Sequence, residues 1–134
     1  YTQAIKYYNS AIKLFVQADD KISIGETQGN LGSVFYNVEI EKYTTNEFVK
    51  ITNAISPIQL AKAYLDSSVE LCIITHDLKT LIYDYQYLSK VYEYKKEYKK
   101  SLEAYKKYTD IKDSVYNQNN NRKIAELENN VTKN

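Results

Sequence analysis

The chain has 134 residues, enough for one domain that buries roughly two-thirds of the surface its unfolded form would expose. Hydrophobic residues make up 43% and charged residues 26%, with only three Gly and one Pro, a composition that favours helices. The net charge of +1 gives no electrostatic basis for binding nucleic acid or an acidic substrate. No apolar run reaches the roughly 18 residues that a membrane helix needs. The single cysteine, Cys72, excludes an internal disulfide.

The sequence contains no methionine, and its first residue already lies in a helical pattern, so we expect a segment excised from a longer protein. Missing targeting signals would then carry no information on location. The 15 tyrosines, against three phenylalanines and no tryptophan, suit thin helical layers. A tyrosine can bury its ring there while its hydroxyl stays in water.

Apolar periodicity predicts the first two helices. Residues 1–18 carry a wide apolar stripe. Asp19 or Asp20 then offers an N-cap for a second helix, with Ser23 and Glu26 as an alternative capping box. The second helix is expected to continue to about residue 38, where an irregular region over 39–56 begins.

Three glycines lie within this second helix. Gly25, Gly29 and Gly32 would each weaken an isolated helix by about 1 kcal/mol relative to alanine. Small residues on a helix are explained by the close approach of another helix or by space for a ligand. We expect packing to explain Gly32 and leave both explanations open for Gly29.

Residues 39–56 form the irregular region. The segment 44–47 resembles a capping box ahead of a short helix that contains Phe48, Val49 and Ile51. This region is therefore predicted to be a helical insertion between longer helices.

A stronger start signal follows the insertion. Ser56 is suited to the N-cap, Pro57 to the first helical position and Gln59 to the third. The helix that begins there is expected to run to the residue before Asp77.

Two further helices complete the regular part of the chain. Asp77 is predicted to cap a helix over 78–94. A polar turn then leads into a helix over 97–116 that folds back on the previous one.

The two halves of this pattern repeat with a shift of 57 residues, the separation of Asp20 from Asp77. The predicted caps fall on each other, which chance hydrophobic patterning would not require. We therefore predict an internal repeat. The residues that coincide are Ala4 with Ala61, Tyr7 with Tyr64, Ser10 with Ser67, Leu14 with Leu71, Leu31 with Leu88, and Val34 with Val91.

The repeat resembles the tetratricopeptide repeat. That motif has Leu-Gly followed by an aromatic residue in its first helix, as at Leu31, Gly32 and Phe35, and Leu88 with Tyr92 occupies the same positions in the other unit. The resemblance implies an all-α tetratricopeptide-repeat superhelix of antiparallel helix pairs, with a helical insertion and a C-terminal capping helix. It names a fold and not a ligand.

The resemblance also implies a division of the chain. The predicted parts are an array over 1–116, made of a partial first repeat 1–18, a second repeat 21–75 with the insertion 39–56 and a third repeat 78–116, followed by a capping or linker helix over 117–134.

The asparagine-rich tail allows two structures. Asn117 lies 16 residues after Ser101, just as Asp20 and Asp77 lie 16 residues after Ala4 and Ala61. We therefore predict a turn at Asn117 and a capping helix packed on the last hairpin. An unbroken helix would instead favour a dimerising coiled coil through the narrow apolar seam of Ile124, Leu127 and Val131.

A second resemblance concerns the C-terminal part. Residues 101–117 and 123–128 resemble the last repeat of bacterial sensor histidine kinases and helix-turn-helix transcriptional regulators. The resemblance implies an extracytoplasmic, periplasmic sensory region of a membrane protein with a cytoplasmic output module. A cytoplasmic adaptor for protein–protein interaction is the alternative.

No catalytic constellation is found, and we predict a non-catalytic chain without metal or cofactor. His76 is the only histidine, at a predicted helix end, and a surface role is expected. Cys72 lies on an apolar face and is expected to be a buried, inert thiol. The lysine- and tyrosine-rich run 92–112 could suggest a nucleic-acid surface, but its interspersed acidic residues indicate a mixed, solvated face without direct nucleic-acid binding.

The concave groove implied by the tetratricopeptide resemblance is the candidate site. Its polar and aromatic side chains would suit hydrogen bonding and ring stacking on an extended peptide or protein segment. An alternative is that Tyr83 and Tyr87 only pack against neighbouring helices. The predicted groove residues are Glu26, Gly29, Asn30, Ser33, Tyr36 and Asn37 from one unit, and Tyr83, Gln86, Tyr87, Lys90, Glu93 and Tyr94 from the other.

Overall fold

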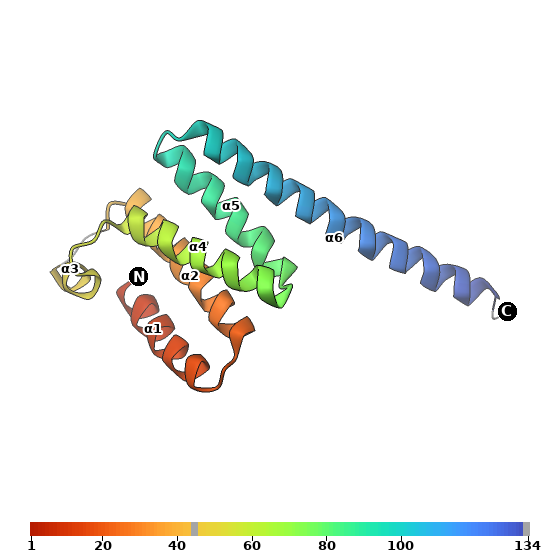
Figure 1. Cartoon of the computed structure of the whole chain (residues 1–134), viewed down its shortest axis with the longest axis horizontal. Coiled ribbons are helices and arrows are strands. Elements are labelled where there is room, and N and C mark those ends of the chain that lie inside the picture. The colour runs from red at the N-terminus through yellow and green to blue at the C-terminus, as the bar shows by residue number, and fades with distance from the viewer. Residues whose placement is uncertain (44–45, 133–134) are drawn as a thin grey trace.

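The computed structural model describes residues 1–43 and 46–132 and consists of helices and short connections (Figure 1). The predicted all-α class is confirmed. The helices of the described residues are α1 (Thr2–Gln17), α2 (Lys21–Ile40), α3 (Asn46–Thr52), α4 (Pro57–Thr75), α5 (Leu78–Tyr94) and α6 (Tyr98–Thr132).

The long helices pack against one another in chain order. α1 contacts α2, α2 contacts α4, α4 contacts α5 and α5 contacts α6, while α2 and α5 also touch each other directly. Figure 1 shows the short α3 beside the N-terminal end of α1, and an ion pair between Lys6 and Glu47 joins the two helices. The predicted short helix in the insertion is thus present.

The core lies mainly between α2, α4 and α5. Gly32 allows α2 and α4 to approach closely, since a Cβ built there would lie 2.5 Å from Leu65 Cγ and 3.2 Å from the Ala61 carbonyl oxygen. The packing explanation for Gly32 is therefore confirmed. The buried apolar residues of these three helices include Leu31, Phe35, Val38, Ala61, Leu65, Cys72, Leu81, Leu88 and Val91.

The two predicted caps adopt the same geometry. Asp20 accepts a hydrogen bond from the Ser23 backbone N–H at 3.1 Å, and Asp77 accepts one from the Thr80 backbone N–H at 3.2 Å. Each carboxylate satisfies a donor that the first turn of a helix leaves unpaired. Both caps are confirmed, and each includes the same backbone hydrogen bond, from the third residue of the helix that follows.

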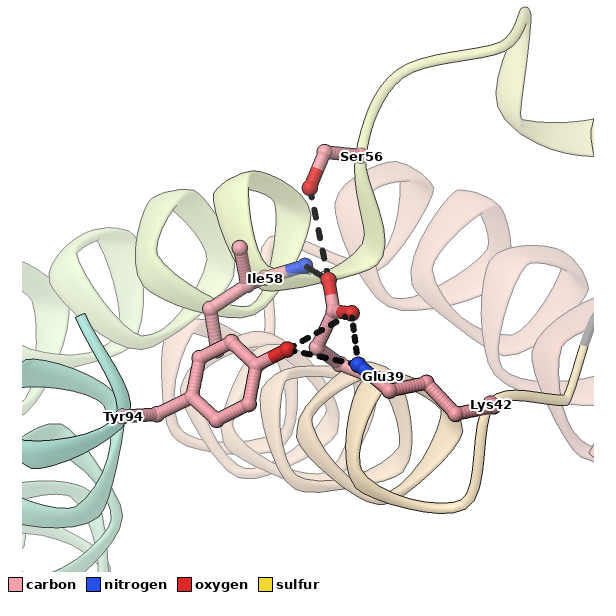
Figure 2. A network of polar contacts seen from close by, with 5 residues as sticks. All are labelled: Glu39, Lys42, Ser56, Ile58 and Tyr94. Carbon is pink, nitrogen blue, oxygen red and sulfur yellow. Dashed lines mark hydrogen bonds and ion pairs between the residues drawn. The ribbon is translucent and has the colours of Figure 1, made fainter.

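The start of α4 is capped differently from the prediction. Ser56 is the N-cap residue, but its side chain makes no cap hydrogen bond. Glu39, near the end of α2, instead accepts hydrogen bonds from the Ile58 backbone N–H at 3.2 Å and the Ser56 hydroxyl at 3.4 Å (Figure 2). The cap of one helix is thus supplied by another helix.

The predicted capping box ahead of α3 falls partly on Thr44 and Thr45, which lie outside the described residues. Within α3, Phe48 is buried and Val49 is exposed. The insertion is anchored through Phe48, whose ring centroid lies 6.2 Å from that of Phe35 on α2.

The predicted turn at Asn117 is wrong, because α6 runs without interruption from Tyr98 to Thr132. Eleven residues after each cap, the earlier repeats place a buried leucine, Leu31 or Leu88. The corresponding position after Asn117 is Glu128. A helix folded back at Asn117 would therefore lack an apolar residue at this position, which reduces the burial that could offset the helical hydrogen bonds broken by a turn.

The C-terminal half of α6 consequently leaves the helical layer. Side chains beyond Tyr116 in the described part of α6 are exposed, and the helix projects away from the other helices in Figure 1. Among the described residues, no helix combines the length and apolar character required to cross a bilayer.

Candidate functional site

A cleft lies between α2 and α5, the two helices that the repeat register equates. It has a volume of about 260 Å³. Each helix forms one wall. α2 contributes the negatively charged Glu26 and α5 the positively charged Lys79. The remaining lining residues are Gly29 and Asn30 from α2, and Thr80 and Tyr83 from α5.

A cluster of tyrosines continues from this cleft along α5. The ring centroids of Tyr83 and Tyr87 are 5.0 Å apart, and Tyr87 meets Tyr36 of α2 edge to face with centroids 5.8 Å apart. The Lys90 ammonium lies 4.9 Å from the centroid of the Tyr87 ring. The cluster therefore bridges α2 and α5 through aromatic and cation–π contacts.

Burial sets the ionisation of these rings. Desolvation raises the pKa of Tyr87 to about 12, with hydrogen bonding to Tyr83 as a further cause and hydrogen bonding to Asn37 opposing it. Desolvation, followed by the charge of Glu93, also raises the pKa of Tyr36. At neutral pH these hydroxyls are uncharged, so they can act as hydrogen-bond donors and acceptors and not as bases.

The structure divides the predicted groove residues into those that are available and those that are engaged. Glu26, Asn30 and Tyr83 line the cleft, and Tyr83 is 43% exposed. Tyr87 packs against the core, so its contacts fit the alternative stated above, in which this ring packs against neighbouring helices. Gln86 is half-buried on α5.

Two predicted groove residues are committed to other partners. Ser33 is buried, and its hydroxyl donates to the Asn30 carbonyl oxygen at 2.8 Å. The Tyr94 hydroxyl donates to Glu39 Oε2 at 3.1 Å and accepts from Lys42 Nζ at 2.9 Å (Figure 2). Tyr94 thereby ties the end of α5 to the end of α2.

Lys79 and Thr80 belong to the cleft but were absent from the prediction. They lie in the first turn of α5, ahead of the first position transferred from the tetratricopeptide groove. Their place one turn before Tyr83 was the signal that could have identified them.

Asp84 is a further residue that sequence reasoning missed. It is 0% exposed, and its Oδ2 lies 2.5 Å from the Ser68 hydroxyl oxygen. Its Oδ1 has no hydrogen-bond partner within the described part of the chain. Desolvation raises the pKa of Asp84 to about 7.

The surroundings of Asp84 explain Gly29. A Cβ built on Gly29 would lie 2.6 Å from Asp84 Oδ1 and 3.3 Å from the Ser68 hydroxyl oxygen. Ser68 Oγ is also 2.8 Å from the Gly25 carbonyl oxygen. A protonated Asp84 can donate to Ser68 while the one hydroxyl proton of Ser68 goes to that carbonyl. Gly29 thus makes room for a buried carboxyl group.

Cys72 and His76 occupy structural positions. Cys72 is 1% exposed, so the predicted buried thiol is confirmed, and desolvation raises its pKa to about 11. His76 is exposed and ends α4 in the left-handed conformation at φ 57°. The described residues contain no group of three or more His, Cys, Asp or Glu side chains that could hold a metal ion.

Lysines of the 92–112 run cover tyrosine rings. The Lys100 ammonium lies 5.9 Å from the centroid of the Tyr92 ring, and that of Lys107 lies 5.4 Å from the centroid of the Tyr85 ring. These ammonium groups support the contact between α5 and α6.

Comparisons with known proteins returned no match among protein-family models, curated proteins or solved structures.

Proposed function

We propose that this chain is a non-catalytic binding module of the tetratricopeptide-repeat class that holds an extended peptide or protein segment in the cleft between α2 and α5. The observation that carries the proposal is the pairing of these helices. They are equivalent under the 57-residue shift, they contact each other, and polar and aromatic side chains line the cleft between them.

The tetratricopeptide assignment is supported by the order of contacts. Consecutive helices pack as neighbours, and Asp20 and Asp77 cap equivalent helices with equivalent hydrogen bonds. In that class the first helix of each pair lines the concave side, so α2 and α5, as the first helices of their pairs, would line it.

The lining of the cleft favours a particular kind of peptide. Glu26 and Lys79 contribute opposite charges, so the cleft has little net charge and no preference for a strongly acidic or basic segment. The exposed part of the Tyr83 ring offers a flat apolar surface with a polar hydroxyl, and the Asn30 amide can both donate and accept. A polar, uncharged peptide with an apolar or aromatic anchor fits these groups.

A phage-displayed library of random peptides tests the cleft directly. Peptides selected on the folded chain should lose at least tenfold in affinity, about 1.4 kcal/mol, when Tyr83→Ala is introduced. The matched control is Tyr98→Ala, because Tyr98 is 65% exposed and lies on α6 outside the cleft. If the selected peptides bind both variants and the original chain equally, the cleft is not the binding site.

For the whole protein we propose the sensory region of a bacterial signal-transduction or transcription-regulatory protein, on the extracytoplasmic side of the membrane. The support is the resemblance of residues 101–117 and 123–128 to the last repeat of such proteins. The alternative is a cytoplasmic adaptor. The sequence of the parent gene separates them, since the sensor requires a membrane helix within a few tens of residues after Asn134.

A further inference from the structure

The C-terminal half of α6 carries an apolar face that no other helix of the described chain covers. Ile124, Leu127 and Val131 are 53%, 52% and 73% exposed. They fall on one side of the helix, at the alternating spacing of three and four residues that defines a coiled-coil seam. A helix of about 16 residues standing alone in water is marginally stable, so a partner on this face would stabilise it.

The residue types along the seam favour a two-stranded, parallel partner. With Ile124 at position a of a heptad, Leu127 is at d and Val131 is at the next a. β-Branched residues at a with leucine at d are the combination that favours parallel dimers. Asn117 occupies the preceding a position, where a buried asparagine specifies register and dimeric state at some cost in stability.

The charges beside the seam select the same orientation. Lys123 is at position g and Glu128 at the following e position. In a parallel pair, each Lys123 faces Glu128 of the second chain, which gives two attractive contacts. In an antiparallel pair, the g positions face each other and so do the e positions, bringing lysine against lysine and glutamate against glutamate.

The other helices leave room for a second chain. α6 packs against α5 through Ala104, Tyr108 and Ile111, of which Ala104 is buried. At about 100° per residue these positions lie roughly half a turn around the helix from the seam. Figure 1 shows the end of α6 projecting clear of the helical layer.

We propose that residues 117–132 form a parallel two-stranded coiled coil with a second copy of this chain. The described part of this segment is about 24 Å long at 1.5 Å per residue, and two of its five seam positions are asparagine. Association through this segment alone is therefore expected to be weak.

Sedimentation equilibrium of the full chain over a concentration series tests the seam. The apparent mass should rise from 15.6 kDa toward twice that value as the concentration passes the dissociation constant. Leu127→Glu should lower the association constant by about tenfold or more. The control Ala125→Glu adds the same charge at position b, away from the seam, and should leave association nearly unchanged. A chain that stays monomeric throughout, or equal effects of the two variants, overturns the proposal.

Charge swaps test the parallel orientation. Lys123→Glu and Glu128→Lys should each weaken association, because each makes both facing pairs like-charged. The double variant Lys123→Glu/Glu128→Lys should restore it. In an antiparallel pair each of these residues faces its own copy, so a charge swap leaves the facing charges alike and association unchanged. Single variants that associate as strongly as the original chain would therefore overturn the parallel arrangement.

Discussion

Two carboxylates stand where α2, α4 and α5 meet, and they are satisfied to very different degrees. Glu39 accepts hydrogen bonds from Ile58, Ser56 and Tyr94 and pairs with Lys42, near the helix ends (Figure 2). Asp84 lies deeper, with one oxygen on Ser68 and the other without a partner in the described residues.

The difference shows that one side-chain type can play opposite roles at one junction. Glu39 at the helix ends meets unpaired backbone and side-chain donors, so its oxygens find hydrogen-bond partners there. Asp84 is surrounded by helix middles, whose backbone donors are already used, so its charge is penalised by desolvation. Variants at these sites and their neighbours can therefore separate the two roles.

The largest expected effect is the pH dependence due to Asp84. Its pKa is raised from 3.8 to about 7, so the folded chain holds a proton that the unfolded chain has released over this interval. The contribution of protonated Asp84 to the free energy of unfolding is fully present below pH 3.8 and is lost as the pH rises through about 7. The loss has an upper limit of about 4 kcal/mol.

Urea denaturation at a series of pH values, compared with Asp84→Asn, measures this contribution. The comparison is needed because Asp20, whose pKa is lowered by hydrogen bonds from Ser23, contributes the opposite trend. The free energy of unfolding of the original chain should fall relative to Asp84→Asn between pH 4 and 7. Parallel curves would mean that Asp84 is ionised in the fold.

A smaller effect is expected from Gly29→Ala. The added methyl group would lie 2.6 Å from Asp84 Oδ1, so the carboxyl group or the helix must move, at a cost of about 1–3 kcal/mol. In an Asp84→Ala background the methyl group has space, and the cost should be smaller. A double-mutant cycle on thermal unfolding measures the difference, and additive effects would show that the two residues do not compete for space.

The Glu39 junction should respond next. Glu39→Ala removes the acceptor for the Ile58 backbone N–H at the start of α4, and the loss of such a cap costs about 0.5–2 kcal/mol. Glu39→Gln keeps an acceptor oxygen and should cost less. Equal destabilisation by both variants would indicate that the charge, and not the cap, carries the contribution.

The smallest effect is expected from Lys42→Ala. The Lys42 side chain is 71% exposed and its ammonium lies 3.6 Å from Glu39 Oε2. Exposed ion pairs contribute about 0–1 kcal/mol, and salt screens them. The change in melting temperature should be small and should shrink in high salt, because salt screens the pair with Glu39. A large loss that salt does not change would show that the hydrogen bond to the Tyr94 hydroxyl carries the contribution.

The sequence predicted much of the candidate site, but not the contacts between its side chains. The groove positions implied by the tetratricopeptide resemblance included Glu26, Asn30 and Tyr83, which line the cleft. It could not reveal that Ser33 is turned to the Asn30 carbonyl or that Tyr94 is held by Glu39. Those assignments depend on contacts between side chains, which spacing along the chain does not specify.

The sequence by itself determined helices α1 to α5, the start of α6 and the caps at Asp20 and Asp77. Apolar periodicity, capping and turn chemistry act over a few residues, so they can be recognised without the fold. The tertiary structure alone decided that Glu39 caps α4, that Gly29 accommodates Asp84, and that α6 continues past Asn117. Each of these depends on which groups from distant segments meet, and on how much apolar surface a turn would bury there.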